Sequence, residues 1–302
     1  MSDSVWHLPT EARNSSTTDI DQLPTAEIVR LINAEDMRVP ALVAQAIPVM
    51  AQAVDSIVAR LRAGGRLHYF GAGTSGRIAL MDAVELTPTY GIAPGLVVAH
   101  QAGGPEALSA AREGVEDDEA EGGREAAELS NADFAAGITA SGRTPYVAGA
   151  LRSARQAGAG TLLITSNPRA PIALHADLTI AVDTGPEAVA GSTRMKAGTA
   201  QKLVLNCIST AVMIRLGRTY SNLMITIEPT NGKLGERAVG ILAEATGMAE
   251  GPCRAALERA DHKLPVALVM LLRDVTPAAA TELLRRAGGS VRAALQTGIP
   301  HP

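Results

Sequence analysis

The sequence is poor in aromatic residues and cysteine, lacks long apolar runs and carries no excess of positive charge. Phe, Trp and Tyr make up 2% of the 302 residues, whereas apolar residues as a whole make up 46%. A core of this composition is aliphatic, with closely packed helices rich in Ala and Gly. The formal net charge of −4 and the lack of basic clusters interleaved with aromatics argue against nucleic-acid binding.

Two further absences concern membranes and metals. The longest apolar runs, such as Val266–Leu272, are too short to span a membrane, and the polar N-terminus lacks the apolar segment of a signal peptide. We therefore expect a cytoplasmic protein without a membrane partner. Cys207 and Cys253 are isolated, which predicts two small buried apolar residues. The histidines are dispersed, so no metal site is expected.

Strand-like and helix-like segments alternate in the central part of the chain. This alternation predicts an α/β fold with a doubly wound, five-stranded parallel sheet covered on both faces. The strand-like runs lie at 67–70, 96–99, 134–140, 161–165 and 178–182. Helices are expected at 25–33, at 40–63 with an interruption or a kink at Pro48, and at 193–216.

The pattern divides the chain into three parts. We expect an N-terminal arm with helices over residues 1–55, the sheet domain over 56–220, and a small helical C-terminal domain over 240–302. In the last part, Thr276 before Pro277 is typical of a helix N-cap, and Ser290 can cap the final helix.

A glycine turn follows the first strand-like run, in the segment Gly71–Gly76. A strand, a glycine turn and a helix together present free N–H groups to an anion. The glycine spacing also fits a dinucleotide site, which requires an acidic residue after the second strand. The chain instead has uncharged residues at 101–104. Thr74 and Ser75 favour a terminal phosphate; the alternative is a tight turn without a ligand.

A similar loop, Ser141-Gly142-Arg143-Thr144, follows the third strand-like run. Ligands of doubly wound sheets lie beyond the carboxyl ends of the strands, and a phosphate needs several converging donors. Two such loops predict a phosphate site more specifically than one does. The alternative is that Ser141 and Thr144 only cap the next helix.

Other polar candidates follow the fifth strand-like run or lie in helices. Glu187, Ser192 and Lys196 are placed near the sheet edge; Lys196 either adds a cationic donor or pairs with a surface carboxylate. Glu85 lies near the end of the helix after the glycine turn. The acidic run at 113–121 has the composition of a solvated helix face, and composition singles out none of its members.

Three long motifs, GAGTSGRIALMDAVELTPTYG, ITASGRTPYV and GPEAVAGSTRMKAGTAQKLVLNCIST, resemble the N-acetylmuramic acid 6-phosphate etherase family. The segments TEARNSSTTDIDQL and NLM…TNGKL agree, whereas Ile225-Thr226 departs from the usual Val-Asp. The resemblance covers nearly the whole chain. It implies a sugar isomerase (SIS) domain, a phosphosugar substrate, and a homodimer that uses neither metal nor nucleotide cofactor. It also implies cleavage of a D-lactyl ether to N-acetylglucosamine 6-phosphate and D-lactate in bacterial muropeptide recycling.

The resemblance also implies that two glutamates carry the chemistry. Glu85 matches the family's acid in its Asp-Ala-x-Glu-x-x-Pro-Thr segment, and Glu116 matches the glutamate of its Glu-Gly-x-Glu-Asp-Asp segment. Elimination followed by hydration needs a protonated and an ionised carboxyl group. We expect Glu85 to be the acid and the more desolvated of the two, because burial raises a carboxyl pKa.

The distance between the glycine turn and Glu85, roughly 14 Å of helix, sets a constraint. Either the helix breaks before Glu85, or the loop Ser141–Thr144 is the main phosphate cradle with Ser75 assisting, or a dimer interface supplies one glutamate. We favour the second loop. The rival functions are a sensor similar to glucokinase regulatory protein, an aldose–ketose isomerase and, last, a dinucleotide-dependent oxidoreductase.

Overall fold

The computed structural model describes residues 9–226 and 232–296. Residues 1–8 of the predicted arm, and Thr230-Asn231 of the TNGKL motif, lie outside the described ranges. The described residues divide into two compact units, 9–83 with 95–209 and 84–94 with 210–226 and 232–296. The predicted domain limits at 56, 220 and 240 stay a prediction.

The first unit contains the predicted five-stranded parallel sheet, in the order β2-β1-β3-β4-β5. The strands are β1 (Leu67–Gly71), β2 (Val97–Gln101), β3 (Phe134–Thr139), β4 (Gly160–Thr165) and β5 (Leu178–Ala181). β1 pairs directly with β3, with Gly71 opposite Ile138, although β2 follows β1 in the chain. The direction of winding therefore reverses between β1 and β3, which is where such sheets bind ligands.

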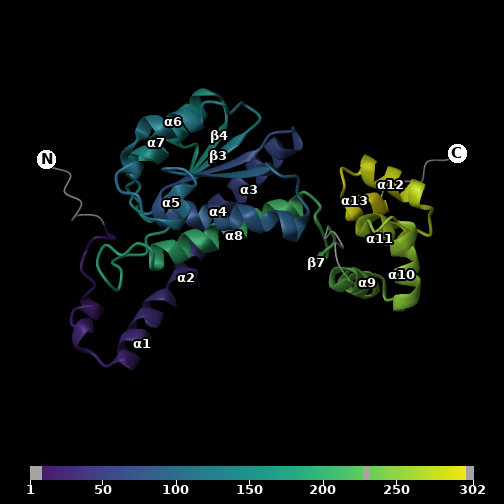
Figure 1. Ribbon diagram of the computed structural model, residues 1–302, viewed down its shortest axis with the longest axis horizontal. Helices are drawn as coiled ribbons and strands as arrows, with labels where there is room; N and C mark the ends of the chain where they lie inside the picture. The colour runs from purple at the N-terminus through teal and green to yellow at the C-terminus, as the bar shows by residue number, and fades with distance from the viewer. Residues whose placement is uncertain (1–8, 227–231, 297–302) are drawn as a thin grey trace. The chain divides into compact units, whose positions relative to one another are not determined.

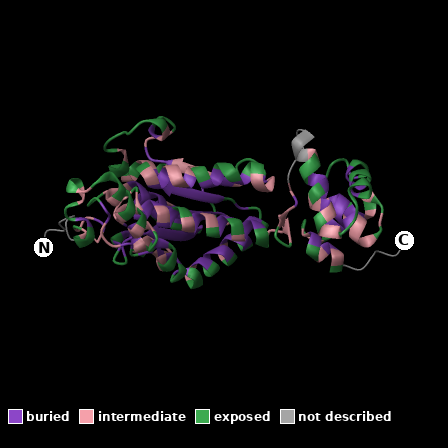
Figure 2. Ribbon diagram, turned by 90° about the horizontal axis from the view of Figure 1, so that it is seen from below, coloured by how far each residue is buried: buried purple, intermediate pink, exposed green. Residues whose placement is uncertain are grey.

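Helices cover both faces of the sheet (Figure 1). On one side lie α6 (Glu119–Glu125) and α7 (Pro145–Gln156), and on the other lie α3 (Ile47–Arg62), α4 (Gly73–Tyr90) and α8 (Lys196–Arg215). Successive residues of β1 point to opposite sides. Phe70 packs in the cluster that includes Leu151 of α7, whereas the Tyr69 hydroxyl donates to Asp82 of α4 at 3.1 Å. The central strands β1, β3 and β4 and the inner helix faces are buried, whereas the edge strands β2 and β5 are partly exposed (Figure 2).

A buried carboxylate joins α4 to α8. Asp82 accepts hydrogen bonds from Asn206 Nδ2 at 2.8 Å and Ser209 Oγ at 2.9 Å, in addition to that from Tyr69. Burial raises the pKa of Asp82 above its ordinary value, against the effect of these donors. The network fixes the middle of α4 against its neighbours.

The N-terminal residues form short helical elements. The arm contains 3₁₀ turns at Ser15–Thr17 and Ile20–Gln22 and leads into α1 (Thr25–Asp36). The predicted second helix is two helices, α2 (Val39–Ala44) and α3. The α1–α2 segment and α3 meet at an angle of 62°. Pro48 lies in the first turn of α3, where a missing N–H group costs nothing, so the chain starts a new helix there rather than continuing the old one.

The second unit is mainly helical, with a two-stranded antiparallel hairpin, β6 (Thr219–Tyr220) and β7 (Leu223–Met224). Its helices are α9 (Gly232–Thr246), α10 (Glu250–Arg259), α11 (Leu264–Arg273), α12 (Pro277–Arg286) and α13 (Val291–Gln296). The predicted cap is confirmed at Thr276, whose Oγ1 accepts from Ala279 N at 3.3 Å. Ser290 Oγ accepts from Ala293 N at the same distance. The core of this unit is aliphatic.

Two expectations about apolar segments can be compared with the structure. In the described ranges, no single helix has both the length and the apolar content needed to cross a membrane. Two pairs of consecutive helices have that length and content only when the two helices of a pair are joined, and each pair is sharply bent. Cys253 is buried as predicted, but Cys207 is exposed, so that prediction is wrong. Val204 and Ile208 occupy the buried face of α8, and position 207 points away from it.

Candidate functional site

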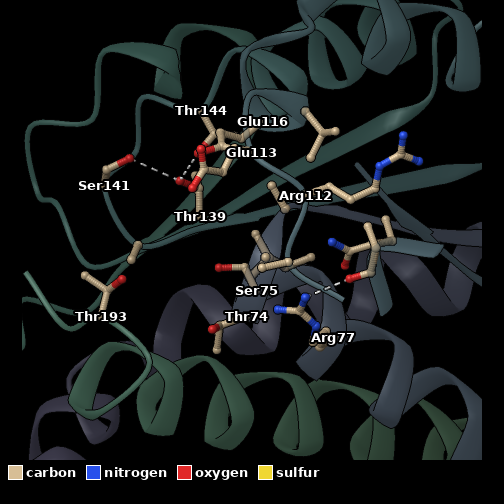
Figure 3. A pocket seen from close by; sticks show the side chains of 18 of the residues that line it. Thr74, Ser75, Arg77, Arg112, Glu113, Glu116, Thr139, Ser141, Thr144 and Thr193 are labelled. Atoms are coloured by element: carbon tan, nitrogen blue, oxygen red, sulfur yellow. Dashed lines mark hydrogen bonds between the residues drawn. The ribbon is translucent and has the colours of Figure 1, made fainter. Parts of the chain in front are cut away.

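A cavity of about 420 Å³ lies beyond the carboxyl ends of β1 and β3 (Figure 3). It is at the reversal of strand order, where the fold places ligands. Five of the predicted site residues line it: Thr74, Ser75, Glu116, Ser141 and Thr144. Both predicted phosphate loops therefore face the same cavity.

The first loop is the start of α4. The helix begins at Gly73, directly after β1, so Thr74 and Ser75 lie in its first turn. The first N–H groups of a helix have no partner within the helix, and the helix dipole adds a partial positive charge there. This end of the cavity is therefore suited to an anion.

The second loop carries a cluster of hydroxyl groups that follows β3. Thr139 Oγ1 lies 2.7 Å from Thr144 Oγ1 and 3.4 Å from Ser141 Oγ, as Figure 3 shows. Thr144 occupies the N-cap position of α7 but makes no side-chain capping bond. The alternative that Thr144 serves only as a cap is therefore wrong, and its hydroxyl group faces the cavity.

Two other predicted residues of this loop shape it without lining the cavity. Gly142 has φ +67°, and a Cβ at this position would lie 2.3 Å from Ala170 Cβ. Glycine is therefore required for the turn. The backbone N–H of Arg143 donates to Ser141 Oγ at 3.2 Å, which orients that hydroxyl group.

Glu116 enters the cavity from the segment between α5 (Glu106–Ser109) and α6. It lies in a 3₁₀ turn, Val115–Asp117, and Glu113 of the same acidic run also lines the cavity. Arg77 of α4 anchors α5, just before this segment, by donating to the carbonyl oxygens of Ala107 at 2.7 Å and Leu108 at 3.1 Å. Most of the acidic run is exposed, as its composition predicts.

Glu85 does not line the cavity of its own chain. α4 runs without a break through Pro88 to Tyr90, so the alternative of a helix break before Glu85 is wrong. Eight residues separate Arg77 from Glu85, about 12 Å of helix. Glu85 and Glu116 are both exposed, so within one chain the expected greater desolvation of Glu85 is not found.

Three further candidates lie outside the cavity lining: Glu187, Ser192 and Lys196. Glu187 is fully buried and accepts the N–H groups of Lys196 at 2.9 Å and Ala197 at 3.0 Å. It therefore caps α8, and burial raises its pKa. Lys196 is 2% exposed and forms an ion pair with Glu35 of α1. Of the two alternatives for Lys196, the structure therefore shows the pairing with a carboxylate, and this carboxylate is buried rather than on the surface.

The cavity also contains residues that the sequence did not single out: Glu11, Thr139 and Thr193. Thr139 is the last residue of β3, so its place at the strand end was a usable signal. Thr193 is adjacent to the predicted Ser192. Glu11 comes from the N-terminal arm, and no local pattern connects it to the sheet. Among the described residues, no group of three or more His, Cys, Asp or Glu is arranged to hold a metal ion.

Known proteins resemble the chain in both sequence and fold. Residues 113–211 match the family model of the SIS domain, and residues 49–155 match that of the glucokinase regulatory protein N-terminal SIS domain. A phosphoheptose isomerase from Francisella tularensis superposes with a TM-score of 0.50 at 18% identity, covering 64% of this chain and 100% of that one. This likeness shows the fold alone.

The sequence relatives are more specific. The N-acetylmuramic acid 6-phosphate etherase of Thermobifida fusca is 62% identical over 268 residues, which cover 89% of this chain and 88% of the relative. The etherase of the same name from Pectobacterium atrosepticum is 50% identical, with coverage of 96% and 97%. Identity at this level over nearly the full length confirms the resemblance found in the motifs. The chain belongs to the N-acetylmuramic acid 6-phosphate etherase family.

Proposed function

We propose that the protein cleaves the D-lactyl ether of N-acetylmuramic acid 6-phosphate with water, giving N-acetylglucosamine 6-phosphate and D-lactate. The observation that carries this proposal is the 62% sequence identity to a named etherase. The cavity lined by hydroxyl groups and Glu116 agrees with it. The enzyme acts as a cytoplasmic homodimer in the recycling of cell-wall muropeptides. It needs no metal or nucleotide.

The hydroxyl cluster is the proposed phosphate seat. Ser141, Thr144 and Thr139 bring three hydroxyl groups together, and the first turn of α4 adds Ser75 and free N–H groups. Charge-assisted hydrogen bonds from such donors hold a phosphate in one orientation. The carbon chain of the sugar then extends along the cavity toward Glu116.

The chemistry is an elimination followed by a hydration. The aldehyde at C1 of the open-chain sugar acidifies the proton on C2, and the Glu116 carboxylate removes it. The lactate oxygen leaves C3 and takes a proton from a second carboxyl group, giving an α,β-unsaturated aldehyde. Water adds to C3 with the roles of the two carboxyl groups reversed.

Glu85 is the proposed acid, and its position calls for a second subunit. It is exposed about 12 Å of helix beyond the cavity, on a helix that also exposes two large apolar side chains, Met81 at 49% and Val84 at 57%. Met81 and Val84 are three residues apart on one helix face, so they form a small apolar patch that a partner subunit can cover. We propose that the dimer covers this face and brings Glu85 of the partner subunit to the cavity.

The reaction is tested with N-acetylmuramic acid 6-phosphate in ¹⁸O-labelled water. We expect D-lactate release, with one label at C3 of the sugar product. Lactate release without label at C3 contradicts elimination and hydration. Tight binding of the phosphosugar without release of lactate supports the second candidate function, a phosphosugar sensor. The match of residues 49–155 to the family model of the glucokinase regulatory protein N-terminal SIS domain is the reason to test this candidate.

The substitution Glu116→Gln should lower kcat by about 10²–10⁴-fold, because general base catalysis contributes a rate acceleration of that size. Phosphosugar affinity should change little. Steady-state kinetics and calorimetry measure the two effects. Asp117→Asn is the matched control, since Asp117 is exposed and does not line the cavity.

Mixing Glu85→Ala subunits with Glu116→Ala subunits tests the origin of the acid. If the partner supplies Glu85, a random mixture of dimers regains roughly a quarter of the wild-type sites. If both glutamates act within one chain, the mixture stays inactive.

A further inference from the structure

The N-terminal arm is attached to the loop that follows β5. Gly191 N donates to the Thr10 carbonyl oxygen at 3.2 Å, and Thr17 Oγ1 donates to the Ala188 carbonyl oxygen at 2.8 Å in a buried position. Thr10 itself is 1% exposed. The arm thus forms a fixed part of the cavity wall beside this loop, which contributes Thr193 to the same cavity.

This attachment carries Glu11 into the cavity. Gly191 has φ +76°, and a Cβ at that position would lie 2.8 Å from Glu11 Oε2. The carboxylate therefore rests against the glycine backbone, where a larger residue would displace it. Glu11 is only partly exposed and lines the cavity.

The Glu11 carboxylate has unused hydrogen-bonding capacity. Within residues 9–226 and 232–296, no hydrogen bond or ion pair is made by its side chain. A carboxylate only accepts hydrogen bonds, and it repels another anion. A phosphate group will therefore avoid Glu11, whereas the hydroxyl or amide N–H groups of a sugar will bind to it.

We infer that Glu11 is a specificity-determining residue that binds a hydroxyl or N–H group of the sugar, away from its phosphate. This inference rests on the proposed function, because that function identifies the ligand as an amino-sugar phosphate. It does not depend on whether the protein cleaves the ether bond. The arm is then part of the substrate site, and it distinguishes a phosphosugar from phosphate alone.

The test compares two ligands by calorimetry, N-acetylglucosamine 6-phosphate and inorganic phosphate. Glu11→Ala should weaken binding of the sugar phosphate by about tenfold, the size of one hydrogen bond to a charged group. Binding of inorganic phosphate should stay unchanged or become tighter, because a negative charge is removed. Glu11→Gln, which preserves shape, should weaken sugar binding less. The control is Asp21→Asn, an exposed carboxylate of the same arm.

Two results would overturn the inference. One is an unchanged affinity for the sugar phosphate in Glu11→Ala. The other is an equal loss of affinity for both ligands, which would mean that the cavity wall has collapsed. The proposed function fails separately: wild-type protein that releases no D-lactate, but binds the sugar phosphate in a Glu11-dependent way, contradicts the reaction and supports the role of Glu11.

Discussion

The cavity and the N-terminal end of α8 both contain polar residues that the sequence predicted as ligand-binding, but in opposite settings. In the cavity, Ser141 and Thr144 are only partly buried and face open space. At the end of α8, Glu187 and Lys196 are buried, and both have partners within the chain. A buried polar group whose hydrogen bonds are all made within the chain contributes to stability. A partly buried hydroxyl group that lines a cavity can still bind a ligand, as Thr144 can beside its contact with Thr139.

The comparison is tested most strongly by Lys196→Met. Removing this ammonium leaves the buried Glu35 carboxylate without its principal partner, since Arg38 is 3.4 Å away and 65% exposed. The free energy of unfolding should fall by about 3–5 kcal/mol. Urea denaturation measures this loss. Phosphosugar affinity of the folded variant should stay near the wild-type value.

Lys202→Met is the control on the same helix, because Lys202 is exposed. Its unfolding free energy should change by no more than about 0.5 kcal/mol. If Lys196→Met instead loses phosphosugar affinity at unchanged stability, the contrast between the two regions is wrong.

The opposite result is expected for the double variant Ser141→Ala/Thr144→Ala. Two hydrogen bonds to a charged ligand are lost, so phosphosugar affinity should fall roughly a hundredfold. The free energy of unfolding should change by less than about 1 kcal/mol. Thr74→Ala/Ser75→Ala is the matched pair, and its smaller effect would identify the loop after β3 as the main cradle. Equal effects would contradict that assignment.

A buried histidine gives the smallest expected effect. Burial, followed by the charges of His100 and Arg66, lowers the pKa of His68 to about 4. The unfolded chain takes up the proton at its ordinary pKa of about 6.5. Stability that is present above pH 6.5 is therefore lost as the pH falls toward 4, by on the order of 2 kcal/mol.

His68→Gln should flatten this part of the stability–pH curve, measured by urea denaturation at a series of pH values. Phosphosugar affinity at neutral pH should not change. His262→Asn is the control: His262 is exposed with φ 58°, a conformation that Asn tolerates. If the free energy of unfolding of His68→Gln depends on pH as steeply as that of the wild type, protonation of His68 is not the cause of the pH dependence.

Local patterns predicted most of the fold. The strands begin and end within two residues of the predicted limits, because buried parallel strands are short apolar runs between turns. Pro48 marked a real break. Glu85 was expected near the end of its helix, whereas α4 continues through Pro88 to Tyr90. Pro88 is tolerated because it lies near the end of the helix, where losing one backbone hydrogen bond costs little.

The site was predicted less completely, for a physical reason. Ser75, Ser141 and Thr144 could be placed at strand ends from the sequence, because parallel strands align their carboxyl ends. The partner of Lys196 is Glu35, 161 residues away in the chain. No local pattern contains such a distance, so Lys196 was predicted as a ligand-binding residue and Glu11 was missed. Glu187 was also predicted to bind the ligand, although the N–H groups it accepts are only nine and ten residues away.

The attachment of the arm has a consequence for the order of folding. Thr17 and Ala188 are separated by 171 residues, so the first described turn of the chain has no partner until the loop after β5 has been synthesised. Contacts of such long range are slow to form because a large loop must close. We expect the sheet to assemble first and the arm to dock last, so that a newly made chain acquires its substrate site only at the end of folding.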